Sequence, residues 1–373
     1  MLGGQGVVFG ELGVAVVDAA PDQVEALRDA VSGASPILAI ESERIVYAFE
    51  TLSPEYLRGF CAAAAALSSN GGAPAAGGWA AAPSAAAPAV DESRVTWGLQ
   101  AVGALTSAFS GKGTRVAVLD TGFDLHQPDF AGRNPVTRSF VPGQPVQDGH
   151  GHGTHCIGTA CGPRMPGQLP RYGIAYDAQI HAGKVLSNRG SGTDAHILGG
   201  IEWAISSGCQ VISMSLGAEV PFGTPYSRVF EAVGQRALTR GTLIVAAAGN
   251  ESQRDRGILK PVGHPANCPS FLAVAAIDSA NRVATFSCTS DPRGGAVDIA
   301  APGVAVHSSW PMPTGYRTIS GTSMATPHVA GVAALLAEAR GVQALALWGA
   351  LMQTALRLPL STVDVGSGLV RSP

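Results

Sequence analysis

Hydrophobic positions from residue 91 onward fall into two alternating patterns. Short, nearly continuous apolar runs predict buried strands, and longer segments with apolar residues every three or four positions predict helices. The expected strands are 115–119, 179–186, 210–214, 242–248 and 271–277, and the expected helices are 153–161, 193–206, 226–239 and 323–338. Because apolar strands that alternate with helices are typical of a parallel sheet covered on both faces, we expect an α/β fold with a doubly wound, mainly parallel sheet.

The N-terminal residues follow a different pattern, which predicts a small α+β unit over residues 1–67. The expected elements are a strand at 13–17, a helix at 21–31, a hairpin of strands at 37–40 and 44–49, and a helix at 52–67. Pro21 suits the first position of its helix. A unit of this size has a thin core, so we expect it to lean on the larger domain at 91–373.

Residues 68–90 are almost entirely Gly, Ala, Pro and Ser. With so little to bury, this stretch predicts a flexible linker and a domain boundary. It is also an expected site of proteolysis.

Composition and charge exclude several classes of function. The formal net charge is only −3, and no basic cluster indicates binding to nucleic acid or a membrane surface. No apolar run approaches the roughly 18 residues that span a bilayer. Glu11 and Asp18 interrupt the place where the apolar core of a signal peptide would lie, so we expect no secretory signal and leave an intracellular location open.

The six cysteines are irregularly spaced and include no CxxC pair. This pattern argues against a disulfide scaffold and against a zinc site. We expect mostly free, buried thiols, with one or two bridges left open.

The segment 321–331, GTSMATPHVAG, predicts a tight turn that delivers a hydroxyl group to the first turn of a buried helix. Unpaired N–H groups and the helix dipole at such a position suit a developing oxyanion. Pro327 fits the first turn of that helix. The alternative is a core helix capped by Ser or Thr, because a hydroxyl is a weak nucleophile without a neighbouring base.

Three polar residues stand where such a base and its partners would lie. Asp120 ends one expected strand, Asn250 follows another, and His152 opens a glycine-rich turn into a helix. Sites in open α/β sheets gather at the carboxyl ends of strands. Taken singly, Asp120 also fits a turn cap, Asn250 fits turn chemistry, and His152 with His155 fits a pair of metal ligands.

The order Asp, His, Asn, Ser changes this balance, because Asp–His–Ser is the order found in subtilisin. VAVLDTGFD, GHGTHCIGTA, VAAAGNE and GTSMATPHVAG resemble the signature segments of subtilisin-like serine proteases, over roughly residues 95–370. Cys156, which follows HGTH, is similar to the proteinase K branch of that family.

The resemblance implies a role for each matched residue. Ser323 would be the nucleophile, His152 the general base, and Asp120 the carboxylate that orients the imidazole. Asn250 and the N–H of Ser323 would bind the oxyanion. His155 and His328 would be packing residues.

The resemblance also implies how a substrate is held. Two edges would bind an extended peptide by backbone hydrogen bonds, and a pocket with glycine at its base would accept large hydrophobic side chains. The residues concerned are Gly190, Ser191, Gly192, Ser215, Leu216 and Gly217 for the edges, and Ala247, Ala248, Gly249 and Gly263 for the pocket. Glu251 is expected at the pocket rim, where it would favour a basic residue.

The family implies no cofactor for the chemistry. Asp129 is a weak candidate calcium ligand, although the region 161–175 lacks the oxygen-rich loop that calcium needs. The unit at 1–67 resembles a propeptide in layout. It would act as an intramolecular chaperone and inhibitor, released by cutting near or within the linker, and the family would imply secretion.

We therefore expect a serine endopeptidase that hydrolyses polypeptides through an acyl-enzyme. It would be made as a self-processing precursor and would prefer large hydrophobic residues before the scissile bond. Two alternatives are a narrow-specificity intracellular maturation protease and a catalytically silent binding or regulatory protein with the N-terminal unit locked in the cleft.

Overall fold

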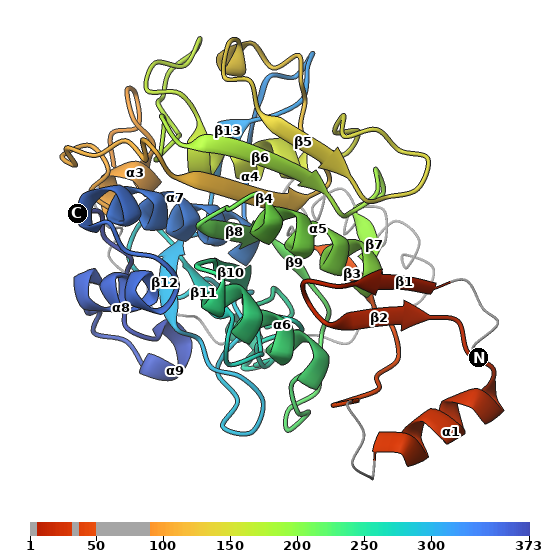
Figure 1. Cartoon of the computed structure of the whole chain (residues 1–373). Coiled ribbons are helices and arrows are strands. Elements are labelled where there is room, and N and C mark those ends of the chain that lie inside the picture. Colours follow the sequence, from red (N-terminus) through yellow and green to blue (C-terminus); the bar gives the residue numbers. More distant parts are fainter. Residues whose placement is uncertain (1–5, 32–36, 50–89) are drawn as a thin grey trace, which may run out of the picture.

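The computed structural model describes residues 6–31, 37–49 and 90–373 (Figure 1). Its centre is a sheet of seven parallel strands in the order β12-β11-β10-β8-β4-β6-β5. The strands are β4 (Arg115–Asp120), β5 (Val136–Ser139), β6 (Gln179–Lys184), β8 (Val211–Met214), β10 (Leu243–Ala247), β11 (Leu272–Ile277) and β12 (Ile299–Pro302). Five of these strands fall within one or two residues of the expected ends, and the doubly wound α/β fold is confirmed.

The order of the strands reverses beside β4. From β4 the chain adds β5 and β6 on one side of the sheet, and it then adds β8, β10, β11 and β12 on the other. Crevices for ligands form at such a switch point, outside the carboxyl ends of the strands. Asp120 is the last residue of β4 and therefore lies at this point.

Four long helices match the expected segments. They are α4 (His152–Cys161), α5 (Asp194–Ser206), α6 (Arg228–Thr239) and α7 (Thr322–Arg340). Helices α4 and α7 pack against each other, and α7 also contacts β8, β10, β11 and β12. In Figure 1, α5 and α6 lie on the side of the sheet that faces the viewer.

The position of Pro327 corrects one expectation. Helix α7 begins at Thr322, so Pro327 lies in its second turn, inside the helix, and not in the first turn. A proline there cannot donate a hydrogen bond to the carbonyl four residues earlier, which is that of Ser323. That carbonyl instead accepts a bond from Ser215 Oγ at 2.8 Å and a longer one from Cys156 Sγ at 3.6 Å.

Smaller elements complete the domain. They are α3 (Trp97–Ala101), β13 (Val306–Ser309), β14 (Tyr316–Ile319), α8 (Ala344–Thr354), α9 (Thr362–Val365) and 3₁₀ turns at Pro128–Phe130 and Arg254–Arg256. Strands β13 and β14 form an antiparallel hairpin. Among the described residues, no single helix is long and apolar enough to cross a membrane. Helices α7 and α8 pass that test only as a pair bent by 106°.

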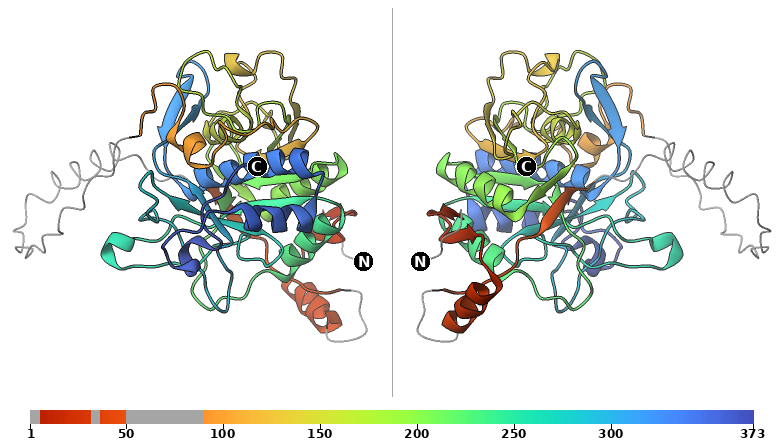
Figure 2. Two further views of the ribbon diagram at one scale, coloured as in Figure 1. Left: turned by 90° about the vertical axis from the view of Figure 1, so that its left-hand side faces the viewer. Right: turned by 90° about the vertical axis from the view of Figure 1, so that its right-hand side faces the viewer.

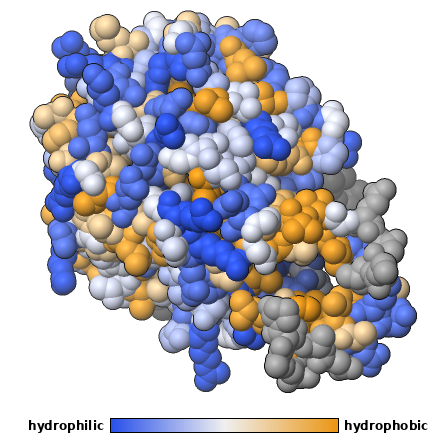
Figure 3. Space-filling view, viewed as in Figure 1, coloured by the Kyte–Doolittle hydropathy of each residue, from blue (hydrophilic) through white to orange (hydrophobic). Residues whose placement is uncertain are grey.

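The N-terminal residues form β1 (Gly6–Phe9), β2 (Val14–Val17), α1 (Pro21–Val31) and β3 (Ile45–Ala48). The expected strand and helix are confirmed as β2 and α1, and β2 pairs with β1. Val7 and Val8 of β1 are exposed. Figure 3, which has the same orientation as Figure 1, shows apolar surface in the region of this hairpin.

The expected hairpin at 37–49 is wrong. Residues 37–44 form no strand, and β3 pairs with two strands of the large domain, β7 (Ser191–Thr193) and β9 (Leu216–Gly217). In the right-hand view of Figure 2, β3 runs into the body of the large domain, whereas α1 lies at its edge. The helix expected at 52–67 and most of the linker lie outside the described residues.

Candidate active site

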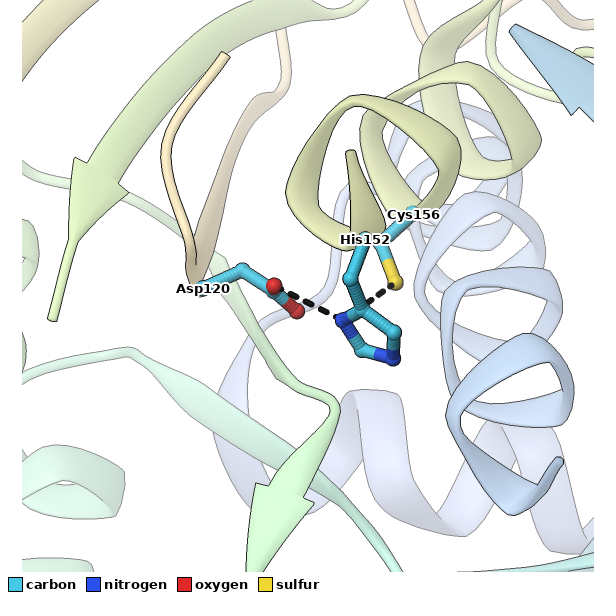
Figure 4. A group of neighbouring side chains, drawn as sticks. All are labelled: Asp120, His152 and Cys156. Atoms are coloured by element: carbon cyan, nitrogen blue, oxygen red, sulfur yellow. Dashed lines mark hydrogen bonds and ion pairs between the residues drawn. The ribbon is translucent and has the colours of Figure 1, made fainter. Parts of the chain in front are cut away.

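The main sheet and two helices carry the three residues of the predicted triad. Asp120 ends β4, His152 is the first residue of α4, and Ser323 lies in the first turn of α7. His152 Nδ1 lies 2.8 Å from Asp120 Oδ1, and both side chains are buried (Figure 4). A carboxylate at Nδ1 leaves Nε2 as the nitrogen that can accept a proton. In the part of the chain that the structure describes, His152 Nε2 is buried without a hydrogen-bond partner.

The charge of Asp120 sets the basicity of His152. Burial alone would lower the pKa of the imidazole, but the adjacent Asp120 carboxylate raises the pKa of His152 well above its usual value. Burial also raises the pKa of the neighbouring Cys156 thiol, to about 11. Cys156 is therefore a neutral thiol near neutral pH. Because it carries no charge, Asp120 is the charged partner of His152.

Asp120, His152 and Cys156 also form a group of three potential metal ligands, whose ligand atoms lie within 4.8 Å of one another. Thiolate, not thiol, binds metals. The raised pKa of Cys156 and the hydrogen bond between the other two side chains favour an acid–base pair over a metal site.

Asp148 fixes the start of α4 and was not predicted from the sequence. Its carboxylate accepts hydrogen bonds from the N–H groups of Gly151 and Thr154, at 2.8 and 2.9 Å. It also accepts a bond from the hydroxyl of Thr121, at 2.9 Å. Asp148 thus satisfies free N–H groups of the helix that carries His152 and ties that helix to the turn after Asp120.

Lys184 supports the same turn and was also missed. The side chain is fully buried at the end of β6, and its ammonium group donates to the carbonyl of Thr121 and to Asn188 Oδ1. Burial lowers the pKa of Lys184, whereas Asp148 and Asp120 oppose that shift. A lysine in a strand usually signals exposure, so only the packing reveals this role.

The hydroxyl of Ser323 and the backbone of the N-terminal segment share one hydrogen-bond acceptor. Ser323 Oγ donates to the carbonyl of Ser215 at 3.0 Å, and the N–H of Phe49 reaches the same carbonyl at 3.4 Å. The nucleophile candidate and the backbone of Phe49 therefore meet at one carbonyl oxygen at the edge of the cleft.

Asn250 lies beside Ser323 and holds the carbonyl of Phe49. Asn250 Nδ2 donates to Phe49 O at 2.9 Å. Its own Oδ1 accepts from the N–H and the hydroxyl of Thr322, both at 2.9 Å. These two bonds fix the orientation of the amide, so that its N–H groups point to the carbonyl oxygen of Phe49.

The two expected substrate edges hold β3 between them. Strand β3 is antiparallel to both, with Val46 opposite Gly192, Tyr47 opposite Ser191 and Gly217, and Ala48 opposite Leu216. The N–H of Ala48 adds a bond to the carbonyl of Gly190 at 2.9 Å. The edges Gly190–Gly192 and Ser215–Gly217 thus bind an extended peptide of this chain.

The side chain of Phe49 is buried, with 6% of its surface exposed, and its ring lies beside Gly217 of one edge and Gly263 of the expected pocket. A Cβ atom on Gly217 would lie 2.6 Å from its ring, and one on Gly263 would lie 3.8 Å from it. These two glycines leave the space that the aromatic ring fills.

The other pocket residues lie close by in the fold. Ala247 and Ala248 are buried at the end of β10, and the carbonyl of Ala248 accepts from the N–H of Gly263. Gly249 has φ 118°, a conformation that favours glycine. Burial raises the pKa of Glu251, whose carboxylate accepts from the Cys288 thiol.

Asp129 is held by donors from the protein. Its Oδ2 accepts from the hydroxyls of Tyr172 at 2.5 Å and Tyr316 at 3.0 Å, and its Oδ1 accepts from the N–H of Gly167 at 2.6 Å. These contacts favour a structural role for this carboxylate over the calcium role that the resemblance implied.

The remaining histidines and cysteines of the motifs have packing roles. His155 Nε2 contacts the carbonyls of Val306 and Arg317, and burial lowers its pKa to about 3. His328 Nδ1 contacts the carbonyl of Met324, and burial lowers its pKa to about 4. The five described cysteines are free, buried thiols, and Cys61 lies outside the described residues.

Comparison with known proteins identifies the family of this chain. Residues 111–368 match the model of the Subtilase family, so the chain belongs to that family and is a serine endopeptidase. It is 42% identical over 233 residues to Subtilisin from Bacillus pumilus, a match that covers 62% of this chain and 79% of that protein.

Two further relatives give the same picture. The chain is 42% identical over 248 residues to Subtilisin Savinase from Lederbergia lenta, covering 65% of this chain and 84% of that protein. It is 42% identical to Subtilisin E from Bacillus subtilis (strain 168), where the match covers 62% of this chain and 57% of the relative's length. Proteins of this family act on polypeptides and need no cofactor for catalysis.

Proposed function

We propose that this endopeptidase is made as a precursor that cleaves its own chain after Phe49, through Ser323, His152 and Asp120. The observation that carries the proposal is the carbonyl of Phe49. Its oxygen accepts a hydrogen bond from Asn250, while the N–H of Phe49 shares the carbonyl of Ser215 with the hydroxyl of Ser323. A peptide bond held in this way is positioned as a substrate.

The reaction follows from the roles of these groups. Ser323 Oγ attacks the carbonyl carbon of Phe49, and His152 Nε2 takes the hydroxyl proton. The hydroxyl must first turn from the Ser215 carbonyl toward the unpartnered Nε2, a realignment typical of free catalytic groups. Asn250 stabilises the negative charge that develops on the carbonyl oxygen.

The tetrahedral intermediate then collapses. The C–N bond after Phe49 breaks, and the imidazolium of His152 gives its proton to the leaving amine of Glu50. Water, activated by His152, hydrolyses the ester between Ser323 and Phe49 and frees the enzyme. Asp120 stabilises the imidazolium through both steps.

The bound segment also supports a preference for large hydrophobic residues before the scissile bond. Phe49 is buried, and Val46, three positions earlier, is completely buried, whereas Tyr47 and Ile45 are 53% and 59% exposed. A strand with one face in the cleft buries some side chains and leaves their neighbours in solvent. We propose that other substrates bind in the same register.

The proposed first cut, after Phe49, therefore lies upstream of the linker. The sequence alone had favoured a cut near or within residues 68–90. Only Phe49 has its carbonyl at Asn250 among the described residues. The segment before it would act as an inhibitor until it dissociates.

The test uses the full-length chain and a fluorophosphonate probe, which reacts with activated serine hydroxyls. The wild-type chain should react with the probe and hydrolyse peptides, and Ser323→Ala should lose about 10⁶-fold in turnover and stay whole. A wild-type chain that stays whole and inert to the probe would instead favour a binding protein with its cleft permanently filled.

A further inference from the structure

Two acidic residues before β3 reach the N-termini of two helices of the large domain. Glu41 Oε1 accepts from the N–H groups of Arg228 and Val229 in the first turn of α6, at 2.7 and 3.2 Å. Its Oε2 accepts from the hydroxyl of Ser227, at 2.6 Å. The acidic side chain is only 20% exposed.

Glu43 makes the equivalent contact on α5. Its Oε1 accepts from the N–H of Ala195 in the first turn of that helix, at 3.0 Å. The guanidinium of Arg44, the next residue, donates to Glu41 at 2.9 Å and to Asp194, the first residue of α5, at 3.3 Å. Two neighbouring helix N-termini thus each hold one carboxylate from the same short segment.

The donors belong to the large domain and not to the segment that they hold. With the N-terminal segment bound, Ser227, the N-cap of α6, is 4% exposed, and its hydroxyl also accepts a hydrogen bond from the N–H of Phe230 in that helix at 3.1 Å. Free N–H groups and the positive end of the helix dipole favour a negatively charged ligand at this position. Burial alone would raise the pKa of Glu41, but hydrogen bonds from Ser227, Arg44 and Val229 keep it below its usual value.

We propose that these helix N-termini form an exosite for acidic residues of peptide substrates. The exosite is defined by Ser227 with the first turn of α6 and by the first turn of α5. Glu41 and Glu43 precede Phe49 by eight and six positions. After the N-terminal segment leaves, the exosite favours substrates with carboxylates at those two distances before the residue that fills the pocket. This inference rests on the proposed cleavage after Phe49.

The register of β3 and the path of residues 41–44 before it fix those distances. The backbone of β3 is paired on both sides, and Phe49 is anchored in the pocket. A substrate bound in the same register, with its residues before the strand on the path of residues 41–44, brings its eighth preceding residue to Ser227. A carboxylate shifted by two positions would miss the N–H groups of α6.

The test uses the self-cleaved chain after its N-terminal fragment has been removed, and chromogenic peptides with the sequence of residues 37–49. A chromogenic amine replaces Glu50 as the leaving group. A peptide with Glu41→Gln should lose about tenfold in kcat/KM, because a hydrogen-bonded charge is replaced by a neutral amide. Glu43→Gln should lose about threefold, because Glu43 makes one contact and is exposed. Ser42→Ala, at an exposed position between them, is the matched control and should change nothing.

The contribution of the exosite residues of the enzyme is tested by a ratio of two kcat/KM values. With the wild-type chain, the kcat/KM of the unchanged peptide divided by that of the Glu41→Gln peptide should be about ten. In Ser227→Ala the ratio should fall toward one, and in Ser206→Ala, at the other end of α5, it should stay near ten. A ratio compares two peptides on one enzyme, so a partial loss of folded protein does not change it.

Two results would overturn different claims. Equal kcat/KM for the unchanged peptide and the Glu41→Gln peptide, with both hydrolysed, would overturn the exosite and leave the proposed function intact. Failure of the enzyme to hydrolyse either peptide after Phe49 would overturn the proposed function itself.

Discussion

At the scale of single residues, the chemistry depends on how buried polar groups are paired. The Asp120 carboxylate holds Nδ1 of His152, and Asn250 is oriented by Thr322. The first contact leaves Nε2 of His152 free to act as the proposed base, and the second directs the amide N–H of Asn250, the proposed oxyanion donor, at the carbonyl of Phe49. The reactive atoms are thus selected by the hydrogen bonds that their neighbours make.

The raised pKa of His152 predicts how self-cleavage depends on pH. Protonated His152 cannot take the proton of Ser323, so cleavage is slow below the pKa of His152 and rises with pH. Because Asp120 raises that pKa, the midpoint should lie above the usual value of about 6.5. The rate of self-cleavage, followed by gel densitometry between about pH 5 and 10, measures it. A midpoint below about 6 would contradict the proposed pairing.

Removing the charge of Asp120 gives a second prediction at this scale. Asp120→Asn keeps the shape of the side chain but no longer stabilises the imidazolium. Self-cleavage should slow by about 10⁴-fold, the loss known for the equivalent change in another triad protease. The same time course at about pH 8 tests it, and a loss below about tenfold would rule out this role for Asp120.

At the scale of elements, much of the fold could be predicted because buried parallel strands are continuously apolar. The runs at 115–119 and 271–277 became β4 and β11 for this reason. Strand β5, VTRS, was missed because it is short, polar and exposed at the sheet edge. Strand β3 was assigned the wrong partner, because its true partners are far away in the sequence and no local pattern encodes them.

The residues of the site also divide into those that the sequence predicted and those that it missed. Asp120, His152, Asn250 and Ser323 stand in recognisable motifs directly after strands or at helix starts. Asp148 and Lys184 stand in no such motif, and a polar residue in a loop or a lysine in a strand is usually solvated. Their roles become visible only once burial and hydrogen-bond partners are known.

Strand β3 gives the prediction at the scale of elements. Phe49→Ala removes a buried aromatic ring from the pocket, so self-cleavage should slow by about 100-fold. Tyr47→Ala is the matched control, since Tyr47 is an aromatic residue of the same strand that is 53% exposed. Its effect should be much smaller. Equal losses in the two variants would show that the pocket does not select Phe49.

At the scale of the whole molecule, the N-terminal residues and the large domain form one closed arrangement. Strand β3 fills the cleft, and Asn250 donates to the carbonyl of Phe49. Glu41 accepts from the N-terminus of α6, and Glu43 accepts from the N-terminus of α5. The cleaved N-terminal segment should therefore remain bound as an inhibitor.

Release of that segment should depend on acid. The pKa of Glu41 is below its usual value of 4.5 in the bound state, so its carboxylate stabilises the complex above about that pH, and this contribution is lost as pH falls through the lowered pKa. Size-exclusion chromatography of the cleaved chain at about pH 6 and about pH 3 should show the fragment bound and then freed. In Glu41→Gln, retention should be weaker at the higher pH. Unchanged retention in that variant would show that Glu41 does not hold the segment.

The central claim is that this endopeptidase cuts its own chain after Phe49. The most direct test is the intact mass of the N-terminal fragment released by freshly purified wild-type chain, with Ser323→Ala beside it. The account predicts a fragment that ends at Phe49, a partner that begins at Glu50, and a Ser323→Ala chain that stays whole. A first fragment that ends within residues 68–90, or the same cut in Ser323→Ala, would contradict it.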